Sequence, residues 1–313
     1  MRLLMVFLDG VGIGPDDPRT NPLVAARLPA LRSLLGGKVP TLNGSLPGGP
    51  RTALVSVDAT LGVEGLPQSG TGQTALLTGE NGAKMVGKHF GPYPYSTLRP
   101  LLADRSIFRR VREAGLESRF ANAFPQRYFD YIERRPTRVT AITYAAVSSG
   151  VPLLRAESLA DGNGISADIT AEGWRGMGYA HVEPIPPRES GRRLARLLDR
   201  FHFVLFEYWK TDHAGHSENF AEAVDALQRL DGLLEGVVTA MDPDRDLLVI
   251  TSDHGNVEDM STKSHTRNPV PALFHGHGAH GAAERLAGDG RATTDLTHVT
   301  PLLVDLLGAA PAA

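Results

Sequence analysis

Acidic residues and a histidine follow three apolar runs of the sequence, at or just beyond the points where those runs end. The run LLMVFL leads into Asp9, FVLFEYWKT leads into Asp212, and LLVITS leads into Asp253 and His254. Carboxylates that lie a few ångströms apart repel one another, and cations bound between them relieve that repulsion. If the fold brings the three run ends together, these residues predict a metal centre.

Two further histidines have spacings that suit the same centre. His216 lies four residues after Asp212 in TDHAGHS, and His265 lies eleven residues after His254. An aspartate and a histidine four residues apart share one side of a helical turn, so both can bind one ion. Each of these residues alone is equally typical of a helix cap or a surface histidine. The prediction therefore depends on their combination.

A glycine-rich stretch supplies candidate nucleophiles. GLPQSGTGQTALLTG, residues 65–79, leads into an apolar helical segment, where backbone N–H groups and the helix dipole favour an anion. It lacks the glycine-lysine-serine order of a P-loop, which argues against nucleotide binding of that type. Ser69, Thr71 and Thr74 carry hydroxyls that a divalent metal would activate for attack on phosphorus. Without a metal centre they would be ordinary turn and N-cap residues.

Buried strands must position these groups. Continuous apolar runs at 3–8, 53–57, 203–206 and 247–250 are typical of strands buried on both faces of a parallel sheet. Helical patterns occupy 106–115, 190–200, 219–241 and 297–308. Because the carboxyl ends of parallel strands share one edge of an open sheet, the carboxylates would converge in a crevice there. We therefore predict an α/β fold with a mostly parallel central sheet.

The middle of the chain has a different composition. Residues 124–187 contain scattered Arg, Gly and Pro and only short apolar stretches such as VTAITYAAV. We expect them to form a small inserted cap over a metal-binding catalytic core made of residues 1–123 and 188–313. Four arginines of this segment suit a solvated charged face or a surface that steers an anionic substrate: Arg127, Arg134, Arg135 and Arg138.

Composition excludes several classes of protein. The 313 residues are 42% hydrophobic, enough for a substantial core, and include no cysteine. Any metal must then be bound by oxygen and imidazole nitrogen. The net charge of -3 gives no general basic field, so we expect no nucleic-acid partner. Neither a signal segment nor a membrane-spanning run is visible, so we expect a cytoplasmic protein without membrane contact, and the oligomeric state is not predicted.

Four motifs carry a resemblance to a known family. FLDGVGIG, GLPQSGTG, TDHAGH and SDHGNVEDMSTKSHTRNPVP resemble motifs of the alkaline phosphatase superfamily, in the branch of cofactor-independent phosphoglycerate mutase and phosphopentomutase. The similarity covers residues 1–122 and 188–313. It implies a three-layer alkaline-phosphatase-like core and two divalent metals, with Mn²⁺ or Zn²⁺ suiting the mixed ligands best. One ion would be bound by Asp9, Ser69, Asp253 and His254, and the other by Asp212, His216 and His265.

The resemblance also implies a mechanism. Ser69 would attack a small phosphorylated metabolite and become phosphorylated; transfer to water makes a phosphatase, and return to the substrate a phosphomutase. Arg267, Lys84 and Lys88 are candidate phosphate contacts. The chain departs from the mutases in its shorter middle segment and in Gln73, where they have histidine. Thr71 and Thr74 therefore stay open as nucleophiles, and we expect phosphate release to exceed isomerisation.

Other functions use the same residues. A phosphodiesterase of this superfamily and a metal-binding regulatory protein without turnover are the two alternatives. A sulfatase is disfavoured because the chain has no cysteine and Ser69 lacks the proline-arginine context of that group. A metallopeptidase is disfavoured because no HExxH motif occurs.

Overall fold

A six-stranded sheet forms the centre of the computed structural model, which describes residues 1–288 and 292–309. Its strands lie in the order β2 (Thr52–Val57), β8 (Val270–Gly276), β7 (Asp246–Ser252), β1 (Arg2–Leu8), β6 (Phe203–Tyr208) and β3 (Ser118–Phe120). Among the described strands of this sheet only β8 runs against the others, because it pairs antiparallel with β2 and β7. The remaining pairs are parallel, and the predicted fold class is confirmed.

The apolar runs form strands because both faces of the sheet are covered. In β1, the side chains of residues 3, 5 and 7 belong to one hydrophobic cluster, and those of residues 4, 6 and 8 belong to the other. A strand buried in this way needs apolar residues at every position, which is what the continuous run LLMVFL provides. Strands β6 and β7 are buried along their whole length in the same manner.

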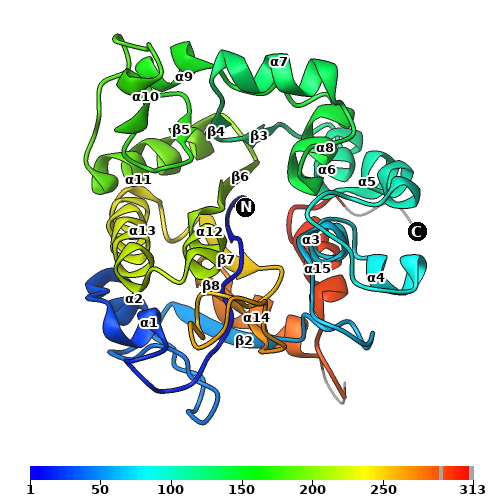
Figure 1. Ribbon diagram of the computed structural model, residues 1–313, viewed down its shortest axis with the longest axis vertical. Coiled ribbons are helices and arrows are strands. Elements are labelled where there is room, and N and C mark those ends of the chain that lie inside the picture. Colours follow the sequence, from blue (N-terminus) through cyan, green and yellow to red (C-terminus); the bar gives the residue numbers. More distant parts are fainter. Residues whose placement is uncertain (289–291, 310–313) are drawn as a thin grey trace.

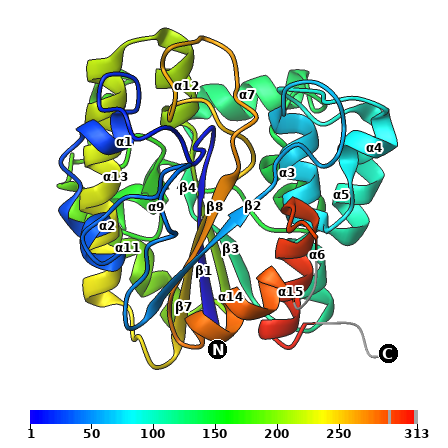
Figure 2. The ribbon, with the colours of Figure 1, turned by 90° about the horizontal axis from the view of Figure 1, so that it is seen from below.

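Helices cover the two faces as separate layers, so the molecule has three layers (Figure 2). One layer contains α1 (Pro22–Ala25), α2 (Pro29–Leu34), α11 (Pro187–Arg196) and α13 (Phe220–Ala240). The other contains α3 (Ser69–Thr78), α5 (Arg99–Arg105), α6 (Ile107–Glu113), α8 (Ala141–Ser148), α14 (Ala279–Ala287) and α15 (Val299–Leu306). Helix α12 (Lys210–Ser217) lies at the carboxyl end of the parallel strands. The short helix α4 (Gly82–Val86) lies near α3.

The helices predicted from periodicity are present with small shifts of their ends. The patterns at 106–115 and 219–241 correspond to α6 and α13, whose first turns are capped by Ser106 and Asn219. The pattern at 190–200 corresponds to α11 followed by a 3₁₀ turn at Leu197–Asp199, and that at 297–308 to a 3₁₀ turn at Leu296–His298 followed by α15. No helix in the described ranges is both long and apolar enough to cross a membrane.

Residues 124–187 lie across one end of the molecule (Figure 1). They form α7 (Gln126–Arg134), α8, α9 (Ala156–Ala160), α10 (Gly173–Gly176) and β5 (Ile165–Ser166), which pairs with β4 (Asn122–Ala123). A small cluster around Trp174 and Leu159 is separate from the two main clusters. Helix α8, however, packs within the main cluster through Ile142 and Ala145. The division into core and cap therefore stays a prediction.

Candidate metal centre

Two of the predicted ligands follow neighbouring strands at the same sheet edge. In the register of the sheet, Leu8 of β1 lies opposite Ser252 of β7 and Tyr208 of β6. The next residues of β1 and β7 are Asp9 and Asp253, so the parallel pairing itself brings these carboxylates together. Both side chains are buried. The convergence at one crevice expected from the sequence is thus a direct result of strand order.

Asp212 and His216 reach this edge from α12, which begins two residues after β6 ends. Their spacing of four residues places them on one side of the helix, with His216 Nε2 3.3 Å from Asp212 Oδ2. Thr211 anchors the helix, because its hydroxyl donates to the carbonyl of Asp9 at 2.6 Å. Gly10 has a φ of 68°, and a Cβ there would lie 2.6 Å from Asp212 Oδ1. Glycine is needed here so that β1 and α12 can approach closely.

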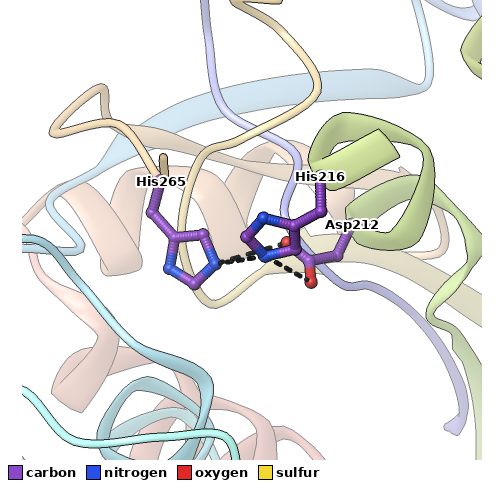
Figure 3. A group of neighbouring side chains, drawn as sticks. All are labelled: Asp212, His216 and His265. Carbon is purple, nitrogen blue, oxygen red and sulfur yellow. Dashed lines mark hydrogen bonds and ion pairs between the residues drawn. The ribbon is translucent and has the colours of Figure 1, made fainter. Parts of the chain in front are cut away.

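His265 faces Asp212 and His216 from the loop that precedes β8 (Figure 3). Its Nε2 lies 3.5 Å from Asp212 Oδ1 and 3.1 Å from His216 Nε2. The Nδ1–H groups of the two rings donate to backbone carbonyls, that of His265 to Pro67 at 2.7 Å and that of His216 to Lys263 at 3.0 Å. Each ring therefore directs Nε2 toward Asp212, the orientation that histidines take when they bind a metal.

A second group gathers around His254. Its Nε2 lies 3.0 Å from Ser69 Oγ, 3.4 Å from Asp9 Oδ1 and 3.6 Å from Asp253 Oδ2. The ring of His254 stacks on that of His265, with centroids 3.8 Å apart. Burial lowers the pKa of both imidazoles, so they are neutral and have a free nitrogen lone pair for an ion.

The buried carboxylates fit a bound cation. Asp253 is fully buried, and neither of its oxygens accepts a hydrogen bond; Asp9 Oδ1 is also buried without one. Burial and the charges of Asp253 and Asp212 raise the pKa of Asp9 well above its usual value, and burial together with Asp212 raises the pKa of Asp253 to about 7. Carboxylates in this environment need a positive charge that no described side chain supplies, and divalent ions would provide it.

Asp212 lies between the two groups. Candidate ligand atoms come within 4.8 Å of one another in the set Asp212, His216 and His265 and in the set Asp9, Asp212 and His254. Burial opposes ionisation of Asp212, but hydrogen bonds from His216 and Asn256 favour its charged form and lower its pKa. The resemblance assigned Asp212 to one ion, whereas the geometry places it in both sets of candidate ligands.

The arrangement matches a known family. Residues 166–311 match the model of the Metalloenzyme superfamily. Among curated proteins, the 2,3-bisphosphoglycerate-independent phosphoglycerate mutase of Legionella pneumophila is 32% identical over 140 residues, which is 41% of this chain and 26% of that protein. The corresponding mutase of Moorella thermoacetica is 29% identical over 135 residues, 41% of this chain and 25% of that protein. The chain thus matches only about a quarter of the length of these relatives.

Solved structures extend the likeness to the whole fold. The structure of PH0037 protein from Pyrococcus horikoshii has a TM-score of 0.60 at 14% identity and covers 100% of this chain and 98% of its own. Alkaline phosphatase from the Antarctic bacterium TAB5 has a TM-score of 0.54 at 10% identity, with 99% and 98% covered. Leishmania mexicana phosphoglycerate mutase has a TM-score of 0.52 at 14% identity, with 99% and 96% covered. The chain therefore has the fold of these proteins, and residues 166–311 are similar to the Metalloenzyme superfamily. The resemblance stated from its motifs is confirmed.

Two residues that hold the candidate metal centre in place were not identified from the sequence. Asn256 Nδ2 donates to Asp212 Oδ1 at 2.6 Å. Glu258, fully buried, accepts from the backbone N–H groups of Gly12 at 2.9 Å and Asn256 at 2.7 Å, and from the hydroxyl of Thr266. It thereby ties the segment that follows β1 to the connection between β7 and β8. The sequence did contain a signal for these two residues, because both fall within the SDHGNVED motif.

The candidate metal centre opens into a cavity of about 460 Å³. Ser69, Asp212, His216 and His265 line it, together with the cation Lys263. Within the described ranges, the lining does not include the predicted phosphate contacts Arg267, Lys84 and Lys88, all of which are exposed. Their role stays a prediction, and Lys263 is the better-placed cation.

The two alternative hydroxyls lie elsewhere. Those of Thr71 and Thr74 donate to backbone carbonyls, at 3.1 Å to Gln68 and 2.7 Å to Gly70, and both residues are fully buried. Neither lines the cavity, whereas Ser69 does.

Proposed function

We propose that this protein is a two-metal phosphoryl-transfer enzyme acting on a small phosphorylated metabolite, with Ser69 as the nucleophile. One observation carries the proposal. Ser69 Oγ lies 3.0 Å from His254 Nε2, lines the cavity with the second ligand group, and belongs to the first residue of α3. A hydroxyl that lies between candidate metal ligands and a helix N-terminus is suited to attack on a phosphoryl group.

The residues would bind the ions as two sets. Asp9, Ser69, Asp253 and His254 would bind one, and Asp212, His216 and His265 the other, with Asp212 within reach of both. Two divalent ions, when bound, would polarise the phosphoryl oxygens and lower the pKa of the attacking hydroxyl. The mixed oxygen and imidazole ligands favour Mn²⁺ or Zn²⁺.

The chain itself would orient the reaction. Ser69 would attack phosphorus from the start of α3, where the helix dipole and free N–H groups favour the negative charge of the phosphoryl oxygens. Lys263 lines the same cavity and would contact the phosphate or the leaving group, although its ammonium also lies 2.8 Å from Glu218. Water or a second substrate hydroxyl would then take the phosphoryl group from Ser69. We favour water as the acceptor, which would make the enzyme a phosphatase. We also propose that it acts in the cytoplasm.

The test is turnover of the Mn²⁺- or Zn²⁺-loaded protein with p-nitrophenyl phosphate and a panel of phosphorylated sugars and glycerates. Phosphate release is measured separately from isomer formation, and mass spectrometry of the quenched reaction detects phosphoserine. We expect Ser69→Ala to lower turnover by at least about a thousandfold while keeping the metals. Thr74→Val is the matched control in the same helix and should keep turnover within a few-fold.

The other outcomes separate the alternatives. Turnover of bis(p-nitrophenyl) phosphate but not of monoesters would favour a phosphodiesterase. Isomer formation without free phosphate would favour a phosphomutase. Bound metal without turnover of any ester would favour a regulatory protein and contradict the proposal.

A further inference from the structure

A second, larger cavity lies beside the metal centre, between the middle segment of the chain and the end of β6. Its volume is about 690 Å³, and aromatic side chains form much of its wall. The aromatic residues are Phe124, Tyr128, Tyr131, Trp174 and Trp209, and we name this space the aromatic cavity. The large ring of Trp209 is 40% exposed, although its neighbours in the chain are largely buried.

Two pieces of chain link the wall of the aromatic cavity to that of the metal cavity. Trp209 and Lys210 line the aromatic cavity, and Asp212, two residues further along α12, lines the metal cavity. On the other side, Pro92 lines the metal cavity and the hydroxyl of the next residue, Tyr93, lies 3.4 Å from the hydroxyl of Tyr131 in the aromatic cavity. A group attached to a phosphoryl at the metal centre would therefore extend toward the aromatic cavity.

Two of the three charged side chains that line the aromatic cavity are cations that form no ion pair within the described residues. The carboxylate of Asp168 also lines it, but it already accepts from Ser166 Oγ at 2.5 Å and from the backbone N–H groups of Ala171 at 2.8 Å and Gly173 at 3.1 Å. Arg127 and Lys210 form no ion pair with any described carboxylate. The Lys210 ammonium lies 5.0 Å from the centre of the Trp209 ring.

We infer that the aromatic cavity binds the alcohol portion of the substrate, and that this alcohol carries a planar ring system of about nucleoside size. The inference rests on the proposed phosphoryl transfer and specifies its substrate class. The volume of about 690 Å³ falls in the range of small-molecule sites, about 300–1,000 Å³, which are mostly apolar and aromatic with few polar groups. A short polyhydroxy acid has no ring to stack on these side chains and would leave them in contact with water.

The kinetic test uses two esters that differ only in the ring. Adenosine 5′-monophosphate and ribose 5-phosphate present the same sugar phosphate with and without a planar base. For the metal-loaded protein we expect kcat/KM to be at least about tenfold higher for the nucleotide, because stacking of a base on an aromatic side chain gives this order of discrimination. Trp209→Leu should reduce the ratio to near one, and Trp209→Phe should retain most of it.

A matched control separates stacking from a general effect of losing an exposed ring. Tyr95 is 39% exposed, close to the 40% of Trp209, and lines neither cavity. Tyr95→Leu should leave the ratio of the two kcat/KM values unchanged.

A binding test is independent of turnover. The chain has two tryptophans, and the other one, Trp174, is buried and donates to Ser166 Oγ at 2.7 Å. Adenosine 5′-monophosphate should quench the fluorescence of the wild-type protein but quench Trp209→Phe much less, and ribose 5-phosphate should quench neither. This titration also works with Ser69→Ala.

The outcomes are distinguishable. Equal kcat/KM for the two esters together with no ring-dependent quenching would overturn the inference and leave the proposed phosphoryl transfer intact. Ring-dependent quenching without turnover of any ester would contradict the phosphoryl transfer and support the cavity as a site for ring-bearing phosphates.

Discussion

The Nε2 atoms of His216 and His265 lie 3.1 Å apart, while the Nδ1 atom of each ring is directed at a backbone carbonyl. Two nitrogen lone pairs at this distance repel unless a cation or a shared proton lies between them. The pair therefore defines the most direct test of metal binding.

Loss of one imidazole should remove one ion. We expect His265→Ala to lower the metal content, measured by mass spectrometry of the purified protein, from two ions per chain to one. His213→Ala is the matched control, because His213 is an exposed histidine of the same helix as His216 and contacts Glu222 rather than the centre. Equal metal content in wild type and His265→Ala would exclude His265 as a ligand.

Asn256 should matter through Asp212. Its Nδ2 donates to Asp212 Oδ1 at 2.6 Å and holds the carboxylate toward the histidines. Because partners of metal ligands commonly contribute 10–100-fold to affinity, we expect Asn256→Ala to weaken Mn²⁺ binding by roughly that factor in a chelator competition assay. Asn163→Ala, at an exposed position of the middle segment, should not change the affinity. An unchanged affinity in Asn256→Ala would show that Asp212 needs no support.

The metal-free protein should lose stability as the pH rises. Burial and the charge of Asp253 raise the pKa of Glu207 from 4.5 to about 8, and those of Asp9 and Asp253 are raised as well. For an acid whose pKa is higher when folded, the stabilisation is complete below the unfolded pKa and disappears as the pH passes the folded value. Between pH 4.5 and 8, Tm in a chelator should fall by at least about 5 °C.

Two comparisons check this assignment. Glu207→Gln should flatten the dependence of Tm on pH, because an amide does not ionise. Mn²⁺ should reduce or reverse the fall, since the ion stabilises ionised Asp9 and Asp253. A metal-free Tm that rises with pH over this range would contradict the prediction.

Gly10 should not tolerate a side chain. A Cβ would lie 2.6 Å from Asp212 Oδ1, and the φ of 68° strains any other residue. We expect Gly10→Ala to lower Tm by several degrees and to weaken metal binding, because Asp212 must move. Gly281→Ala in α14 is the control, since its Cβ would meet nothing within 4 Å, and alanine there should stabilise the helix slightly. Metal affinity equal to wild type in Gly10→Ala would show that Asp212 can relax freely.

Long apolar runs made most of the sheet predictable from sequence. Strands β1, β6 and β7 are buried over nearly their whole length, so each contains a continuous apolar run that is visible without an alignment. Strand β8 was not predicted because Pro271 and His275 interrupt its apolar pattern; both are only partly buried in the strand. The three-residue β3 is too short for any periodicity.

The candidate metal ligands could be predicted from the sequence for a related reason. Asp9 and Asp253 directly follow buried strands, and the four-residue spacing of Asp212 and His216 is a helical signal that α12 satisfies. The basic side chains that would contact the substrate could not be predicted, because the sequence does not show the direction in which an exposed side chain near a motif points. Arg267 and Lys263 lie in the same loop, yet of the two only Lys263 lines the cavity.

The strand order has a consequence for biosynthesis. Candidate ligands follow the central strands β1, β6 and β7, which are translated in that order, so the nascent chain exposes Asp9 long before its neighbours exist. Strand β1 has no partner on either side until β6 and β7 have been translated. The candidate ion-binding pocket therefore cannot be complete before His265 has been translated, and a chain interrupted earlier would carry the first candidate ligands without their partners.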